Sequence, residues 1–167
     1  MIIVSEIYDV VDEQDRVIGK ASREECHEKG LIHRTVQVYI VLNDGRVVLQ
    51  KRSETADTFP GRYTAPAAGH VDAGERYEDA AVRELREEMG LDVPLKRVGN
   101  VKSCDPKHMQ HIMVFSGFSD GPFSTQGETA ELVDLQRTEI EQRMQNQPEA
   151  FTTACIETYR LLQKFVF

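Results

Sequence analysis

The chain has 167 residues, 40% of them apolar, and a formal net charge of −8. These values predict one domain with a sizeable core. The excess of negative charge disfavours broad binding to a nucleic-acid backbone. The sequence has no run of about 18 apolar residues, so no membrane-spanning helix is expected. We therefore expect neither nucleic acid nor a membrane as a partner.

The compartment is predicted from the amino terminus and from the cysteines. The first residues contain no basic segment before a long apolar run, so we expect no signal peptide. Cys26, Cys104 and Cys155 form no CxxC pair, and their odd number argues against a disulfide framework. The expected location is the reducing cytoplasm.

The first part of the chain predicts a hairpin followed by a short helix. Residues 6–11 and 16–19 are short apolar runs on either side of a polar turn. Residues 21–30 favour a helix with Ser22 as the N-cap, Glu25 three positions later and Gly30 as its end. We expect residues 1–33 to form these elements as part of the same domain as residues 34–167.

The central part predicts a second hairpin, an extended segment and a long helix. Residues 35–42 and 47–52 are strand-like and are joined through Asp44-Gly45, a common hairpin turn. Residues 63–68 are expected to be extended. The helix is predicted over 76–89 and ends at Gly90. Its expected apolar stripe is Ala81, Val82, Leu85 and Met89.

The remaining elements complete a mixed pattern. Residues 95–103, 111–118 and 131–135 are predicted strands, and residues 138–145 and 151–165 are predicted helices. Strands and helices are interspersed, and most neighbouring strands are joined as hairpins. The fold class predicted by this order is an α+β sandwich.

Three carboxylates in the long helix lie on one face. At about 100° per residue, Glu84, Glu87 and Glu88 fall within an arc of roughly 100°. Like charges at this spacing destabilise an isolated helix by a few tenths of a kcal/mol. A hard divalent cation beside a phosphate-bearing substrate would neutralise them.

The same stretch resembles the box motif of the Nudix hydrolases. Over residues 69–91 the match includes Gly69, Glu75, Arg83-Glu84-Leu85, Glu87-Glu88 and Gly90-Leu91. The resemblance implies an α/β/α sandwich with a mixed sheet over roughly residues 34–165. It also implies a pyrophosphohydrolase that cleaves a phosphoanhydride bond with Mg²⁺, or Mn²⁺ in its place.

The resemblance assigns roles within the box. It makes Glu84, Glu87 and Glu88 the metal-binding carboxylates and adds the carbonyl of Ala68 to the metal shell. Glu75 and Arg83 are expected to form an ion pair that ties the loop to the helix. Gly69 and Gly90 are then structural positions of the box.

Other roles stay open at this level. The general base is either Glu84 or a carboxylate from a distant loop, for which Glu128 and Glu131 are the candidates, with a plain surface role equally open for both. Three basic residues near the box are candidates for binding phosphate oxygens, with a plain surface role equally open for each: Lys51, Arg52 and Arg62. The aromatic residues considered for stacking on the substrate are Tyr39, Phe59, Tyr63 and Phe123.

The segment before the box is similar to the front half of isopentenyl-diphosphate isomerases. This similarity covers residues 25–53 and 58–64. In those enzymes histidines hold a metal, and His27, His33 and His70 occupy comparable places. The isomerases carry a catalytic cysteine where this chain has Ala68, so a proton donor to the alkene is missing. We favour local hydrogen bonding for His27 and His33, with a vestigial or alternative metal site as the other interpretation.

Three functional hypotheses follow. The first is a Mg²⁺-dependent hydrolase of a small nucleoside diphosphate-type substrate. The second is an isomerase-like enzyme, which Ala68 disfavours. The third is a binding module that has lost catalysis, which the intact box disfavours. A homodimer is left open.

Overall fold

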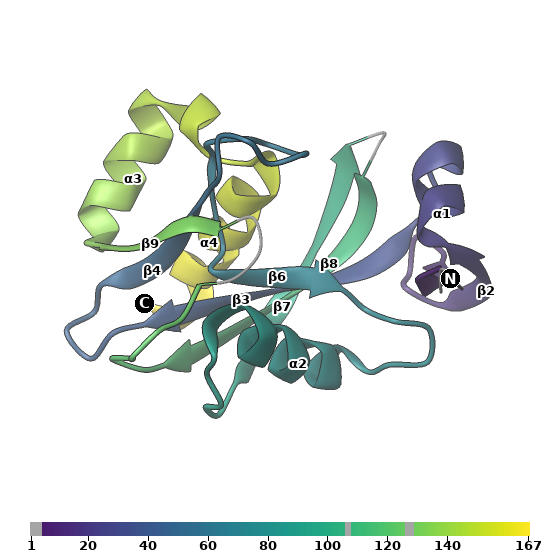
Figure 1. Ribbon diagram of the computed structural model, residues 1–167, viewed down its shortest axis with the longest axis horizontal. Coiled ribbons are helices and arrows are strands. Elements are labelled where there is room, and N and C mark those ends of the chain that lie inside the picture. The colour runs from purple at the N-terminus through teal and green to yellow at the C-terminus, as the bar shows by residue number, and fades with distance from the viewer. Residues whose placement is uncertain (1–4, 106–107, 126–128) are drawn as a thin grey trace.

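A mixed β-sheet runs through the molecule, with helices on both of its faces (Figure 1). The computed structural model describes residues 5–105, 108–125 and 129–167, with only the backbone of Cys104, Thr129 and Ala130. The architecture is the predicted α+β sandwich. No helix in these described ranges is long and apolar enough to cross a membrane.

The strands and helices alternate along the chain as follows. The strands are β1 (Ile7–Val11), β2 (Val17–Ser22), β3 (His33–Val41), β4 (Val47–Arg52), β5 (Tyr63–Thr64), β6 (Ala67–His70), β7 (Lys96–Asp105), β8 (His108–Phe118) and β9 (Thr129–Leu135). The helices are α1 (Arg23–Lys29), α2 (Tyr77–Met89), α3 (Arg137–Asn146), a 3₁₀ turn (Pro148–Ala150) and α4 (Thr153–Val166).

Strand β3 is the centre of the main sheet. It pairs in parallel with β8 and antiparallel with β6 and β4. β7 pairs with β8, and β4 continues the sheet to β5 and β9. β6 pairs with residues 35–38 of β3, whereas β4 pairs only with Val41, the last residue of β3. The two strands therefore lie beside different parts of β3. The strand that leads into the box is therefore fixed in register against the centre of the sheet.

Alternation along β3 divides the core between the two faces of the sheet. Val36, Val38 and Ile40 pack with α2, whereas Tyr39 packs with α4 on the other face. Successive side chains of a strand point to opposite faces, so one strand supplies both layers. Helix α2 is thereby held against one face, and α3 and α4 against the other (Figure 1).

The box helix α2 differs in detail from the prediction. Its end is as expected, because Gly90 adopts a left-handed conformation with φ 65°. Its buried face includes Tyr77 and Ala80, whereas the predicted stripe residue Val82 is only half-buried. The buried stripe therefore begins about one turn earlier than predicted and leaves Val82 at its margin.

The amino-terminal hairpin β1–β2 and helix α1 pack beside the loop that precedes α2. The predicted cap is present, since the Glu25 amide donates to Ser22 Oγ at 3.2 Å. The hairpin holds the box loop through two backbone donors: the amide of Ala73 donates to the Ile7 carbonyl and that of Gly74 to Asp9, both at 2.9 Å. Elements that precede the box therefore hold its loop in place.

Candidate active site

The three box carboxylates line one cavity. The cavity has a volume of about 670 Å³, and Glu84, Glu87 and Glu88 of α2 form part of its wall. Strand β6 contributes Ala68 beside them, as the position of its carbonyl in the predicted metal shell requires. The residues that sequence reasoning grouped as a metal site are thus brought together at one surface.

Glu84 lies deeper than the other two carboxylates. Its exposed fraction is 8%, and it sits against Gly69 of β6. A Cβ atom at position 69 would lie 2.1 Å from the carboxyl carbon of Glu84. Only glycine therefore leaves room for Glu84 at this point of the box.

Burial changes the acidity of Glu84. Desolvation raises the pKa of this carboxyl from 4.5 to about 7, although the adjacent Arg83 opposes the rise. Arg83 donates to Glu84 Oε1 at 2.8 Å. Without a bound cation, Glu84 therefore changes charge near neutral pH.

This pKa predicts how stability depends on pH in metal-free protein. A carboxyl whose folded pKa is raised favours the folded state below its unfolded pKa, near 4.5, and loses that contribution as pH rises through about 7. The variant Glu84→Gln has no such titration. In chelator, we expect wild type to lose roughly 2–3 kcal/mol relative to this variant between pH 4 and pH 8. Urea unfolding of both proteins across this range measures the difference, and parallel profiles would contradict it.

Arg83 connects the box loop to the helix. Its guanidinium donates to both oxygens of Glu75 at 2.9 Å, so the predicted ion pair is present and bidentate. It also donates to the carbonyl of His70 at 3.0 Å. The pKa of Glu75 is lowered chiefly by its side-chain hydrogen bond with Arg83. One side chain therefore fixes the loop, the end of β6 and Glu84 together.

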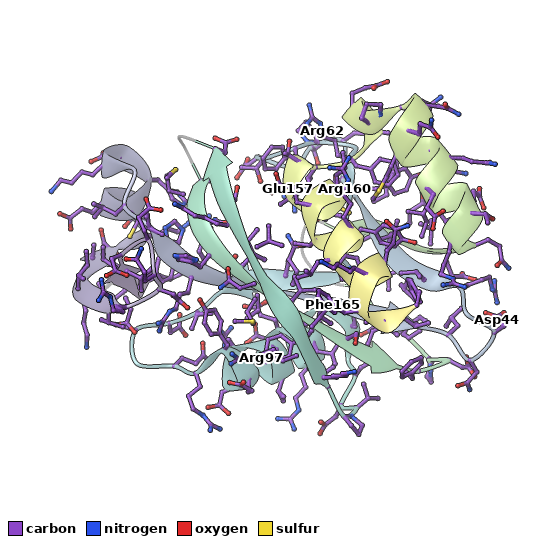
Figure 2. All side chains as sticks on the ribbon, turned by 180° about the vertical axis from the view of Figure 1, so that it is seen from behind. Asp44, Arg62, Arg97, Glu157, Arg160 and Phe165 are labelled. Atoms are coloured by element: carbon purple, nitrogen blue, oxygen red, sulfur yellow. The ribbon has the colours of Figure 1, made fainter. Side chains whose placement is uncertain are left out.

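Of the three basic candidates for phosphate binding, only Arg52 lines the cavity. Lys51 does not, because neighbouring residues of β4 point to opposite faces of the sheet. Arg62 does not line it either: its guanidinium lies over the ring of Phe59 at 5.7 Å, and Figure 2 shows it on the side of α4. The structure therefore brings Arg52, but not Lys51 or Arg62, to the cavity wall. Arg23 of α1 lines the cavity, and no sequence signal indicated it.

Of the two distant general-base candidates, the structure describes only Glu131. Glu131 of β9 is exposed, pairs across the strands with Lys51 and is absent from the cavity wall. Glu128 lies outside the described residues. Of the four aromatic candidates, Phe59 alone lines the cavity.

The three histidines are brought together at one point, which the interpretation of local hydrogen bonding for His27 and His33 did not predict. Their candidate ligand atoms all lie within 4.8 Å of one another. Only His33 makes the local hydrogen bond, to the carbonyl of Leu31 at 2.9 Å. Burial lowers the pKa of all three, that of His70 to about 3. The imidazoles are therefore uncharged at neutral pH.

Comparison with known proteins shows which family the chain belongs to. The model of the NUDIX domain matches residues 31–155, which include the cavity's carboxylates. The chain belongs to the Nudix family. An uncharacterized Nudix hydrolase of Clostridium acetobutylicum is 34% identical over 82% of this chain and 71% of its own length. The chain is thus a Nudix pyrophosphohydrolase.

Other comparisons support the fold and the front-half resemblance. Isopentenyl-diphosphate delta-isomerase 2 of Photorhabdus laumondii is 41% identical over 58% of this chain and 55% of its own length. The crystal structure of DR0079 from Deinococcus radiodurans superposes with a TM-score of 0.79 at 21% identity, covering 93% of this chain and 99% of the other. A Francisella tularensis NMN adenylyltransferase/ADP-ribose pyrophosphatase, solved with AMP and a Mn ion, has a TM-score of 0.60 at 14% identity, covering 78% and 41%. These structures share the Nudix fold.

Proposed function

We propose that this Nudix protein is a Mg²⁺-dependent hydrolase that cleaves the phosphoanhydride bond of a small nucleoside diphosphate-type substrate. The observation that carries the proposal is the convergence of Glu84, Glu87 and Glu88 on one cavity. Such a group of carboxylates supplies hard oxygen donors next to a space large enough for a small molecule.

The residues present fit a divalent cation. Among the described side chains, Arg83 is the only cation recorded in an ion pair with Glu84 or Glu87. Glu84 and Glu87 therefore share this one recorded cation. Glu84, Glu87, Glu88 and the carbonyl of Ala68 would hold Mg²⁺, with Mn²⁺ as a substitute. A bound ion would neutralise phosphate charge and acidify a coordinated water.

The chain's own groups would perform the remaining tasks. Glu84 is the proposed general base, because its carboxyl lines the cavity beside the other two carboxylates, where a water between metal and substrate would lie. Arg83 orients Glu84 through its hydrogen bond. Arg52 on the cavity wall is placed to contact a phosphate oxygen.

An aromatic residue of the cavity wall favours a nucleoside. Phe59 lines the cavity, and stacking on an aromatic side chain accommodates any base. Gln110 also lines the wall, and its side-chain amide nitrogen can donate to a base edge. The Francisella tularensis protein, which shares only the fold, was solved with AMP.

The isomerase hypothesis lacks its thiol. Ala68 lines the cavity where a cysteine would be needed. The described cysteine side chains, Cys26 and Cys155, are buried, and neither lines the cavity. Two free, buried thiols also agree with the reducing cytoplasm that we propose as the compartment.

The proposal is tested by a substrate screen with product identification. Nucleoside di- and triphosphates, sugar nucleotides, dinucleotides and isopentenyl diphosphate are each incubated with the protein and Mg²⁺ or Mn²⁺. We expect a nucleoside monophosphate among the products, with turnover abolished by chelator and restored by the metal. No turnover on any member would favour the binding module, and isomerisation of isopentenyl diphosphate would overturn the hydrolase.

A further inference from the structure

A buried glutamine reaches the cavity from the central strand of the sheet. Gln37 lies on β3 between Val36 and Val38, which pack with α2. Because neighbouring residues of a strand point to opposite faces, its side chain is directed to the face covered by α4. Gln37 is only 7% exposed and lines the cavity wall. A polar side chain buried to this extent is expected to have a hydrogen-bond partner for each end of its amide.

Only one end of this amide has a partner. The hydroxyl of Thr158, a fully buried residue of α4, donates to Gln37 Oε1 at 2.7 Å. Among the described residues, no group accepts a hydrogen bond from the amide nitrogen of Gln37. Since the side chain lines the cavity, this nitrogen faces the space within it. Gln37 therefore presents N–H donors to whatever occupies the cavity.

A second buried hydroxyl fixes which end of the amide faces the cavity. The hydroxyl of Tyr39 lies 2.8 Å from that of Thr158. When Thr158 donates to Gln37, Tyr39 can donate to Thr158, and each short contact carries one proton. The reverse orientation of the amide would leave one hydroxyl proton with only Cys155, whose carbonyl is 3.3 Å from Thr158 and 3.4 Å from Tyr39. The two hydroxyls therefore hold the donor end of the amide toward the cavity.

The neighbouring part of the wall is uncharged. Ala154 lies one turn before Thr158 on the same face of α4 and also lines the cavity. The other wall residues from β5 and from the start of α4 are threonines: Thr64, Thr152 and Thr153. Phosphate oxygens are bound most strongly by cationic groups, which these elements do not bring to the wall. A neutral donor among neutral neighbours suits an uncharged acceptor, such as a carbonyl oxygen.

We propose that Gln37 determines base specificity by donating to a carbonyl oxygen of the substrate's base, with Thr158 as the positioning residue behind it. The inference rests on the proposed function, because a nucleoside substrate supplies the base. Phe59 can stack on any base, whereas a fixed donor distinguishes between base edges. Uracil, cytosine and guanine carry a carbonyl, and adenine has an amino group where guanine has its carbonyl. An adenine at this point would leave the donor without its acceptor.

Binding of nucleoside monophosphates tests this assignment without turnover, since they contain no phosphoanhydride bond. Wild-type protein in Mg²⁺ is titrated by calorimetry with UMP, CMP, GMP and AMP. We expect at least one of the first three to bind roughly 5-fold or more tightly than AMP, because a buried donor that loses its acceptor weakens binding by at least this factor. AMP binding as tightly as the best of the others, or no binding of any of the four, would overturn the inference.

Variants of the two residues locate the donor. Gln37→Leu removes it at similar size and should abolish the preference over AMP. Thr158→Val removes only the hydroxyl behind the amide and should reduce the preference at least about twofold. Thr158→Ser keeps a hydroxyl and should restore it. Binding of inorganic pyrophosphate should be unchanged in all three variants. A matching loss of pyrophosphate binding would show that Gln37 contacts a phosphate and that the assignment to the base is wrong.

Tyr159→Phe is the matched control. Tyr159 follows Thr158 on α4, is fully buried and is absent from the cavity wall, and its hydroxyl has no hydrogen-bond partner among the described residues. Removing this hydroxyl should leave the preference over AMP unchanged, and thermal unfolding checks that every variant folds. Equal effects of Tyr159→Phe and Thr158→Val would refute the positioning role. Hydrolysis is measured separately as turnover with and without chelator, so a failed preference for carbonyl-bearing bases is distinguishable from a failed hydrolase proposal.

Discussion

Replacing Glu87 or Glu88 by Gln is expected to lower kcat/KM for hydrolysis by roughly 100- to 1,000-fold, the range seen when one charge-stabilising group is removed from an active site. The amide keeps the size of the side chain but loses the charge that a divalent cation requires. Folding should be unaffected or slightly favoured, since removing one of several like charges relieves a few tenths of a kcal/mol. Steady-state kinetics and thermal unfolding in chelator measure the two quantities.

The matched control is Asp79→Asn in the same helix. Asp79 lies in the first turn of α2, is exposed and pairs with Arg76 at 3.0 Å, outside the cavity. This change removes the same charge from the same helix and should leave kcat/KM within about twofold. Full activity in both Glu variants would refute the metal-binding role of the cluster.

Arg83→Met is expected to lower the free energy of unfolding by about 2–3 kcal/mol, because charged groups around it lose their hydrogen bonds. In a chain of this size, that change lowers Tm by about 5–10 °C. Arg83→Lys should recover only part of the loss, since an ammonium group cannot reproduce the bidentate contact with Glu75. Chemical denaturation of the three proteins gives the order wild type, Lys, Met.

Arg86→Met provides the comparison for this prediction. Arg86 lies on the same helix and pairs with Asp92 at 2.7 Å, but both side chains are well over half exposed. Exposed ion pairs contribute about 0–1 kcal/mol, so this variant should unfold nearly as wild type does. If Arg83→Met were no more destabilised than Arg86→Met, the connecting role of Arg83 would be wrong.

Local signals in the sequence predicted most of the elements. The Ser22 cap, the Asp44-Gly45 turn and the Gly90 terminus each depend on a few neighbouring residues, and all lie where expected. The parallel pairing of β3 with β8 was not predicted, because the two strands are far apart in the chain. Pairing at long range depends on the whole sheet, which no local pattern encodes.

The residues of the candidate site were likewise predictable only where they depend on local sequence. The box motif placed its three carboxylates on one helix face, and all three line the cavity. Alternation along a strand predicts that Lys51 and Arg52 point to opposite faces, but not which face borders the cavity. The burial of Glu84 and the meeting of three histidines both depend on β6 packing beside other elements. These features follow from tertiary packing.

The hydrogen bonds between the amino-terminal hairpin and the box loop indicate which residues a shortened protein would have to keep. The family match begins at residue 31, after β1, β2 and α1. A fragment trimmed to that boundary would lose the acceptors of the Ala73 and Gly74 amides, and with them Asp15, which accepts a hydrogen bond from Tyr77 at 2.9 Å. We therefore expect the cooperative folding unit to extend beyond the boundary of the family match and to begin at the hairpin.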